Sequence, residues 1–271
     1  PGHYTQPVFS PDGQTIVYFK SGGGYLRSGL WSLDSGIYRV AAQGGESKRM
    51  LKSGSNPQFT SENDRLYFQR GKREEDADNL GLFSVNMEGQ EEQQHYTSAW
   101  ATDYQLSPDG KWVAFIERFN IYLAPFVKSG NPIKLGPKVK ALPLAQVSET
   151  AGNNIHFSGD STKLHWSLGP TLYSRALTDS FTYLDGAPEE LPEEAVQEQA
   201  IGFTAPQHRP EGRLALVGGT ILTMGEAGLI EDGVILVQNN RIEAVGPRSK
   251  IRIPSGTKTI DIDGQVVFPG L

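Results

Sequence analysis

Histidine is the residue type in this chain best suited to hold a metal ion, but its spacing does not favour a metal site. The sequence has five histidines, and none belongs to a His-x-His pair. One couple, His156 and His165, is expected to lie opposite across a β-hairpin. A zinc site needs three or four ligands with supporting hydrogen bonds, and the sequence fixes no third partner. The favoured interpretation is therefore packed histidines, with a metal-binding His156–His165 pair as the alternative.

Other catalytic patterns are incomplete or missing. Asp261-x-Asp-Gly264 resembles the start of a calcium loop, but Val266, Val267 and Phe268 stand where later ligands are expected. The sequence contains no Gly-x-Ser-x-Gly nucleophile elbow and no phosphate-binding loop. It has no cysteine, which excludes disulfides, thiolate metal sites and thiol nucleophiles. We predict no catalytic residue and no cofactor-binding residue in this chain.

Length and charge restrict the general class of protein. A chain of 271 residues predicts about two domains. Its 25 basic and 31 acidic residues are mixed along the chain and give a net charge of −6, which argues against a nucleic-acid-binding surface. No stretch approaches the ~18 apolar residues that a membrane span needs. We therefore expect neither nucleic acid nor a membrane span among its interactions.

The first two thirds of the chain repeat one unit. Each copy has an apolar residue, a four-residue turn and then a run that alternates apolar and polar residues, as one face of a strand does. Ser-Pro-Asp-Gly suits the turn because proline presets φ and glycine accepts positive φ, so Asp12 and Asp109 are interpreted as turn residues. The copies start 50, 47 and 51 residues apart, at Phe9, Phe59, Leu106 and Phe157.

Further strand pairs follow the first three copies, and the third pair is predicted to end in an outer strand at Ile133–Leu135. Four strands per unit is the pattern of a propeller blade. Two insertions interrupt it: 71–79 is expected to be a charged hairpin loop, and 138–154 to be irregular until Ile155. A further long loop is expected over Gly22–Trp31.

This pattern resembles the TolB-like β-propeller repeat. The resemblance implies about six blades, so we expect further blades upstream of Pro1. A partial ring would leave blade faces and sheet edges exposed, which favours association into oligomers. The resemblance also implies a protein partner at the propeller and a periplasmic or secreted location.

The segment 185–212 has the composition of a linker. Four prolines interrupt it and five glutamates lie between them, and Pro192–Ala200 has at most the pattern of two helical turns with a thin apolar face. Beyond it, six short strands are expected in 213–271, separated by glycine, asparagine and proline. Asn239-Asn240 is predicted to form a tight hairpin turn, because asparagine tolerates the left-handed region.

Three pieces of this last segment resemble, in order and at family spacing, the opening of the metal-dependent amidohydrolase superfamily. They are Leu216–Leu222, Glu231–Gly246 and Ile260–Leu271, and they span about 60 residues. In that family a small β-sandwich leads into a barrel through a Pro-Gly-Leu or Pro-Gly-Phe, and a His-x-His metal pair follows. The resemblance implies zinc or another divalent metal in a barrel that this chain lacks, and a substrate class that spans nucleobases, hydantoins, dipeptides and lactones.

The sequence thus predicts an all-β chain: a partial TolB-like β-propeller of about four four-stranded blades, followed by a small partial β-sandwich. The predicted boundaries are 1–184 for the propeller, 185–212 for the linker and 213–271 for the sandwich segment. The predicted function is a segment of a propeller-fused, metal-dependent amidohydrolase in which the propeller binds or screens a small-molecule substrate. The alternative is a non-catalytic TolB-like protein-binding module. Enzymatic activity is not decided by this chain.

Overall fold

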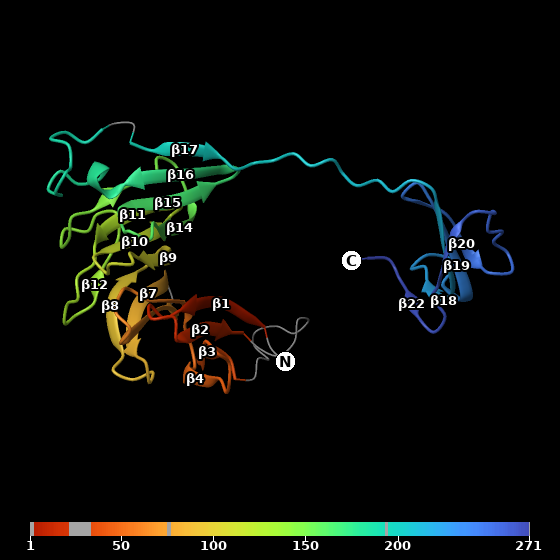
Figure 1. Ribbon diagram of the computed structural model, residues 1–271, viewed down its shortest axis with the longest axis horizontal. Coiled ribbons are helices and arrows are strands. Elements are labelled where there is room, and N and C mark those ends of the chain that lie inside the picture. Colours follow the sequence, from red (N-terminus) through yellow and green to blue (C-terminus); the bar gives the residue numbers. More distant parts are fainter. Residues whose placement is uncertain (1–2, 22–33, 75–76, 193–194, 271) are drawn as a thin grey trace. The chain divides into compact units, whose positions relative to one another are not determined.

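The computed structural model describes residues 3–21, 34–74, 77–192 and 195–270, and within them it is built almost wholly of strands (Figure 1). The chain divides into two compact units, Pro1–Gly202 and Phe203–Leu271. We call them unit 1 and unit 2. The prediction of an all-β chain is confirmed. No helix in the described part of the chain has the length and hydrophobicity needed to cross a bilayer.

Unit 1 begins with two sheets that follow the first two repeats, and all of their strand pairs are antiparallel except β12 with β8. We call each sheet of unit 1 a blade and number the blades in chain order. Blade 1 has the order β1-β2-β3-β4, and blade 2 has the order β12-β8-β7-β6-β5. Their consecutive strands are β1 (Tyr4–Phe9), β2 (Thr15–Lys20), β3 (Gly36–Ala41), β4 (Lys48–Leu51), β5 (Ser55–Gln58), β6 (Arg65–Glu74), β7 (Ala77–Asn86) and β8 (Gln93–Ser98).

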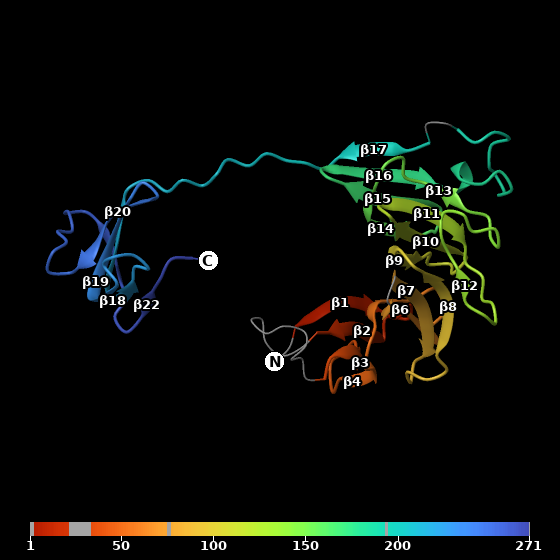
Figure 2. The same ribbon diagram turned by 180° about the vertical axis from the view of Figure 1, so that it is seen from behind.

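Two more sheets complete unit 1, and both views show the four blades following one another in chain order (Figures 1 and 2). Blade 3 has the order β13-β11-β10-β9 and blade 4 the order β14-β15-β16-β17. The strands are β9 (Ala101–Leu106), β10 (Trp112–Glu117), β11 (Asn120–Pro125), β12 (Ile133–Lys134), β13 (Ala145–Gln146), β14 (Asn153–Phe157), β15 (Lys163–Leu168), β16 (Thr171–Ala176) and β17 (Gln197–Ala200), and a 3₁₀ turn spans Leu177–Asp179.

The outer strand of blade 3 differs from the prediction. Ile133–Leu135 was expected there, but β12 adds in parallel to β8 of blade 2, and β13 from the supposedly irregular insertion takes the outer place in blade 3. The buried Leu135 explains the exchange, because it packs into the core between blades 2 and 3. Its backbone N–H donates to Thr97 O at 2.8 Å. Burial of the Leu135 side chain therefore determines which blade β12 joins, against the predicted pattern of four strands per blade.

The prediction of a hairpin loop over 71–79 is also wrong, because β6 and β7 extend into this segment. Strands β6 and β7 stay paired through this segment, from Gly71 opposite Leu80 to Glu74 opposite Ala77. An antiparallel ladder between two adjacent strands satisfies the backbone N–H and C=O groups of both, whatever their composition. The expected long loop over Gly22–Trp31 lies outside the described residues.

The cores of unit 1 lie between consecutive blades, because alternate residues of each strand face opposite neighbours. In β15, for example, Leu164 and Trp166 are buried against blade 3, whereas His165 faces the other way. Leu66 and Phe68 of blade 2 pack in the same manner against blade 1. Burial of such side chains, at ~1.5 to 3 kcal/mol each, is the main force that stacks the blades.

The repeated turns link each blade to the next. In the first repeat, Gly13 has φ +70° and its N–H donates to Ser10 O at 2.8 Å, which confirms the predicted turn. In each link, a backbone N–H in the turn of one blade donates to an oxygen atom in the turn of the next blade. The three hydrogen bonds are Asp12 N to Asn63 Oδ1 at 3.0 Å, Ser61 N to Pro108 O at 2.6 Å, and Asp109 N to Ser161 Oγ at 3.0 Å.

Part of the predicted linker belongs to unit 1. The weak helical pattern in Pro192–Ala200 is not realised; instead Gln197–Ala200 forms β17, which pairs with β16. The edge of blade 4 offers unpaired backbone groups, and an added strand satisfies them without needing an apolar face. The boundary between the units falls after Gly202 rather than at the start of the proline-rich segment.

Unit 2 is one sheet of order β20-β19-β18-β21, with β22 also pairing with β18. Its first two predicted strands are a single strand, because Gly218 (φ +95°) and Gly219 form a bulge rather than a break. Asn239 (φ 45°) and Asn240 (φ 64°) make the predicted hairpin turn. The strands are β18 (Arg213–Leu222), β19 (Leu229–Gln238), β20 (Arg241–Pro247), β21 (Lys258–Asp261) and β22 (Val266–Val267).

Candidate functional site

Four polar residues occupy one equivalent position in the four blades of unit 1. Each lies three residues before the apolar residue that opens a repeat, in the first strand of its blade. Three of them, Gln6, Asn56 and Asn154, have left-handed φ values of 54°, 49° and 53°. We call the set the axial ring; it consists of Gln6, Asn56, Asp103 and Asn154.

A shared irregularity in strand pairing produces this geometry. In blades 1, 2 and 4 the register shifts by one residue at the ring position, so that two residues of the first strand oppose one of the second. Such a bulge redirects a side chain, and its first residue often needs positive φ. Asparagine tolerates that region better than most residues, at a cost of ~1 kcal/mol or more. Blade 3 shifts register one residue earlier, beside Thr102.

Hydrogen bonds join the ring across three blades. Asn56 N donates to Gln6 Oε1 at 2.8 Å, and Asn56 Nδ2 donates to Asp103 Oδ1 at 3.0 Å. Gln69 Nε2 donates to the same carboxylate oxygen at 2.7 Å. These bonds link Gln6, Asn56 and Asp103, whereas the Asn154 side chain donates instead to Ser167 Oγ at 2.9 Å.

Asp103 is the acidic member of the ring. Burial raises its pKa above the usual range, and hydrogen bonds from Gln69, the Tyr104 backbone and Asn56 act in the opposite direction. The ring residues, with Ser55, Gln69, Thr102, Ile116 and Asn153, line a pocket of about 620 Å³. Amides, two hydroxyl groups and one carboxyl group supply many hydrogen-bond donors and acceptors there, which suits a polar ligand.

Sequence reasoning missed the axial ring. The four residues differ in type and lie outside the turn motif that makes the repeats visible. The signal available was their position: aligning the four repeats by their turns and reading three residues upstream gives a polar side chain every time. Asparagine, aspartate or glutamine at the same position of every repeat indicates either a shared backbone conformation or a shared binding site.

The predicted histidine couple does meet, on the face of blade 4 turned away from blade 3. His156 lies opposite His165 in the strand register, and their rings stack with centroids 5.0 Å apart. His165 Nδ1 lies 2.6 Å from Ser174 Oγ, and His156 Nδ1 lies 3.2 Å from Asn154 O. Burial and the neighbouring His156 lower the pKa of His165.

A third metal ligand does not join this couple. Within the described ranges of the chain, no three His, Cys, Asp or Glu side chains group closely enough to hold a metal ion. Two imidazoles alone do not provide the three or four ligands of a zinc site. The donor set of the described residues thus does not fit the metal centre that the amidohydrolase resemblance implies, and we derive no chemical step through such a centre.

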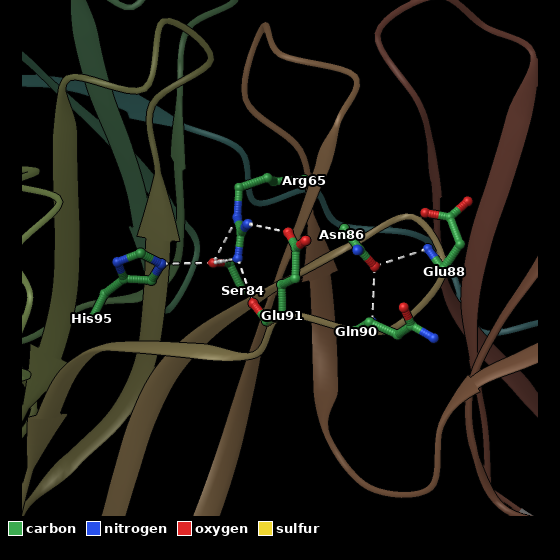
Figure 3. A network of polar contacts seen from close by, with 7 residues as sticks. All are labelled: Arg65, Ser84, Asn86, Glu88, Gln90, Glu91 and His95. Atoms are coloured by element: carbon green, nitrogen blue, oxygen red, sulfur yellow. Dashed lines mark hydrogen bonds and ion pairs between the residues drawn. The ribbon is translucent and has the colours of Figure 1, made fainter.

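A second histidine, His95, belongs to a network of polar contacts in blade 2 (Figure 3). Arg65 Nε and Nη2 donate to Ser84 Oγ at 3.1 and 3.0 Å, and Ser84 Oγ lies 2.7 Å from His95 Nε2. Ser84 Oγ thus has the Arg65 guanidinium and His95 Nε2 as partners, whereas His95 Nδ1 is buried with no hydrogen-bond partner among the described residues. Ser84 and His95 are 0% and 1% exposed, so a substrate cannot reach this pair.

Burial and the charges of Arg65 and Lys128 lower the pKa of His95 to about 4. His95 is therefore neutral at pH 7, packed between Tyr67 and Phe126 at ring distances of 5.6 and 5.3 Å. The same network fixes the turn after β7, where Asn86 Oδ1 accepts from Glu88 N and Gln90 N (Figure 3). We interpret it as a structural element of blade 2.

Four consecutive sheets, antiparallel except for the added β12 of blade 2, define unit 1 as a β-propeller-type domain. Solved structures with a similar arrangement include TolB from Acinetobacter baumannii (TM-score 0.48, 13% identity, 91% of this chain and 56% of that one). Another is the β-propeller domain of the Trilobed protease from Pyrococcus furiosus (TM-score 0.42, 8% identity, 96% and 76%).

Two kinds of curated protein share short stretches with the chain, and no family model matches it. A 5-methylthioadenosine/S-adenosylhomocysteine deaminase of Symbiobacterium thermophilum is 43% identical over 60 residues, which is 22% of this chain and 14% of that protein. A probable dipeptidyl-peptidase 5 of Aspergillus flavus is 35% identical over 105 residues, or 34% and 14%. The chain thus spans about one seventh of the length of these relatives.

Proposed function

We propose that this chain is the propeller-containing part of a larger metal-dependent amidohydrolase, and that the axial ring binds the ligand that the propeller presents to it. The geometry of the axial ring is the main observation in support of the binding role. Backbone strain is maintained at the same place in three blades, and strain of this kind concentrates at ligand sites. The ring side chains also line one pocket, where their amide and carboxyl groups suit a polar ligand.

The catalytic half of the proposal is supported by unit 2. The three family-like pieces fold into one sheet, in which β21 and β22 return parallel to β18. The 43% identity with a deaminase over 60 residues is consistent with this assignment. On this proposal the metal-activated water belongs to a barrel elsewhere in the protein, and unit 1 supplies substrate binding rather than chemistry.

The catalytic proposal is tested on the full-length protein encoded by the same reading frame. We expect it to contain a divalent metal by elemental analysis and to hydrolyse at least one member of a panel of hydantoins, aminopurine nucleosides, dipeptides and lactones. A full-length protein that holds no metal and hydrolyses none of these would overturn the enzymatic half. The binding role of the propeller would remain as a non-catalytic module.

The binding role is tested with Asp103→Asn, which keeps the hydrogen-bond acceptor of Asn56 and Gln69 but removes the charge. We expect KM for the hydrolysed substrate to rise severalfold while kcat stays within twofold. The matched control is Asp64→Asn, an exposed carboxylate of blade 2 remote from the ring. An unchanged KM in Asp103→Asn would refute the assignment of the ring as the binding surface.

A further inference from the structure

A separate pocket lies between the outer parts of blades 2 and 3. It has a volume of about 450 Å³, within the range of small-molecule sites. Its walls come from the end of β8 and the connection to β9, the β10–β11 turn, and the segment that contains β12. Its chemically distinctive lining residues are Ser98, Trp100, Glu117, Arg118, Lys134 and Lys138.

The Glu117 carboxylate is the most unusual group in this pocket. Its residue is only 5% exposed, and within the part of the chain that the structure describes one donor reaches it, Ser98 Oγ at 2.7 Å from Oε2. The Ser98 hydroxyl oxygen also accepts hydrogen bonds from the N–H groups of Trp100 and Ala101, so its proton is donated to Glu117. A buried carboxylate with one hydrogen bond and no paired cation is destabilising by several kcal/mol in general.

The surroundings of Glu117 are apolar and aromatic on the protein side. Its charge adds to the effect of burial in raising the pKa values of Tyr104 and Tyr122. On the pocket side, Gly136 packs next to the carboxylate, and a methyl group added there would be in van der Waals contact with Oε2 and Oε1 at 3.7 and 3.8 Å. The carboxylate is therefore almost wholly buried by the protein, and it borders the pocket.

Three basic side chains line the same pocket, and none of them is paired with Glu117. Within the described ranges, no ion pair of Arg118, Lys134 or Lys138 occurs. Arg118 lies over the Trp100 ring, with its guanidinium carbon 5.1 Å from the ring centroid. Its left-handed φ of 48° in the β10–β11 turn brings it there. The pocket thus combines an uncompensated buried anion with three cations.

We propose that this pocket binds a small zwitterion with a free ammonium group and a carboxylate, of the size of a dipeptide. The ammonium group pairs with Glu117 and supplies the missing hydrogen bonds. The ligand carboxylate pairs with Lys134, Lys138 or Arg118. Trp100, which is 49% exposed, offers apolar surface to a side chain between these two groups. This inference does not depend on the function proposed for the axial ring.

The test is calorimetric titration of the chain with L-leucyl-glycine and two derivatives. N-acetyl-L-leucyl-glycine lacks the ammonium group, and L-leucyl-glycinamide lacks the carboxylate. We expect saturable binding of L-leucyl-glycine and at least tenfold weaker binding of each derivative, since a charge-assisted hydrogen bond generally carries that much affinity. Equal binding of all three compounds, or no saturable binding of L-leucyl-glycine, would overturn the proposal.

Glu117→Gln distinguishes a binding carboxylate from a structural one. It keeps the shape of the side chain and an acceptor for Ser98 while removing the buried charge. We expect at least a tenfold loss of affinity for L-leucyl-glycine, with a melting temperature equal to or above that of the unchanged protein. Glu46→Gln, at an exposed position of blade 1, should alter neither quantity. A lower melting temperature with unchanged affinity would assign Glu117 a structural role and refute the site.

Discussion

Acidification should destabilise unit 1 through His95, and the size of the effect follows from its pKa. The folded protein holds this pKa at about 4, against about 6.5 for an unperturbed imidazole. A histidine with a lowered pKa binds its proton more readily in the unfolded chain, so stability is full above about pH 6.5 and falls as the pH drops toward 4. At 1.36 kcal/mol per pKa unit, the loss between pH 7 and pH 4 is about 3 kcal/mol.

The assay is urea unfolding of the protein at pH 7 and at pH 4, followed by the fluorescence of Trp112 and Trp166, which share the core between blades 3 and 4. His95→Phe keeps the aromatic packing against Tyr67 and Phe126 but removes the titrating group. We expect this variant to lose about 3 kcal/mol less than the unchanged protein between the two pH values.

His208→Gln is the matched control, because it removes a titrating imidazole from an exposed position of unit 2. Carboxylates that titrate in the same range contribute equally to all three proteins and cancel in the comparison. An identical pH dependence in His95→Phe and the unchanged protein would refute the reasoning, since the buried imidazole would then not be the group that couples protons to folding.

Substitutions at three positions test the packing and the turns. Leu164→Ala should cost about 2 to 5 kcal/mol because the side chain is fully buried between blades 3 and 4. Gly152→Ala should cost about 1 to 3 kcal/mol, since the added methyl group would lie 2.4 Å from Ile121 Cδ1 and 2.6 Å from Trp166 Cδ1. Asn240→Gly should leave unit 2 unchanged, whereas Asn240→Val should destabilise it by about 1 kcal/mol or more, because φ is 64°. Urea midpoints measure the first two, and hydrogen exchange in β19 and β20 measures the third; no difference between the two Asn240 variants would contradict the turn assignment.

The blades could be predicted because their signals are local. A Ser-Pro-Asp-Gly turn followed by alternating apolar residues marks a strand, and four copies at nearly constant spacing mark a repeat. The outer strands could not be predicted in the same way. Whether β12 joins blade 2 or blade 3 depends on where Leu135 is buried, and this is a property of the assembled core rather than of the segment around it.

The two polar pockets were unpredictable for a related reason. Glu117 is the last residue of β10, whereas Trp100 and Lys138 lie in two separate connections, and the three meet only when blades 2 and 3 pack together. The bulges that position the axial ring leave no strong mark in the sequence, because Gln6 and Asn154 are ordinary polar residues until their φ values are known. The histidine couple on blade 4 was predictable because its register follows from a single short hairpin.

The turn-to-turn hydrogen bonds of unit 1 have a consequence for how such an array changes over evolution. Their donors are main-chain N–H groups, which every residue except proline carries, so amino-acid replacement at the donor position leaves the donor in place. The link from Ser61 to Pro108 uses main-chain atoms at both ends. Gene duplication of one blade would therefore copy the main-chain donor whatever its sequence, whereas the side-chain acceptors Asn63 Oδ1 and Ser161 Oγ limit how far the sequences of those two turns can diverge.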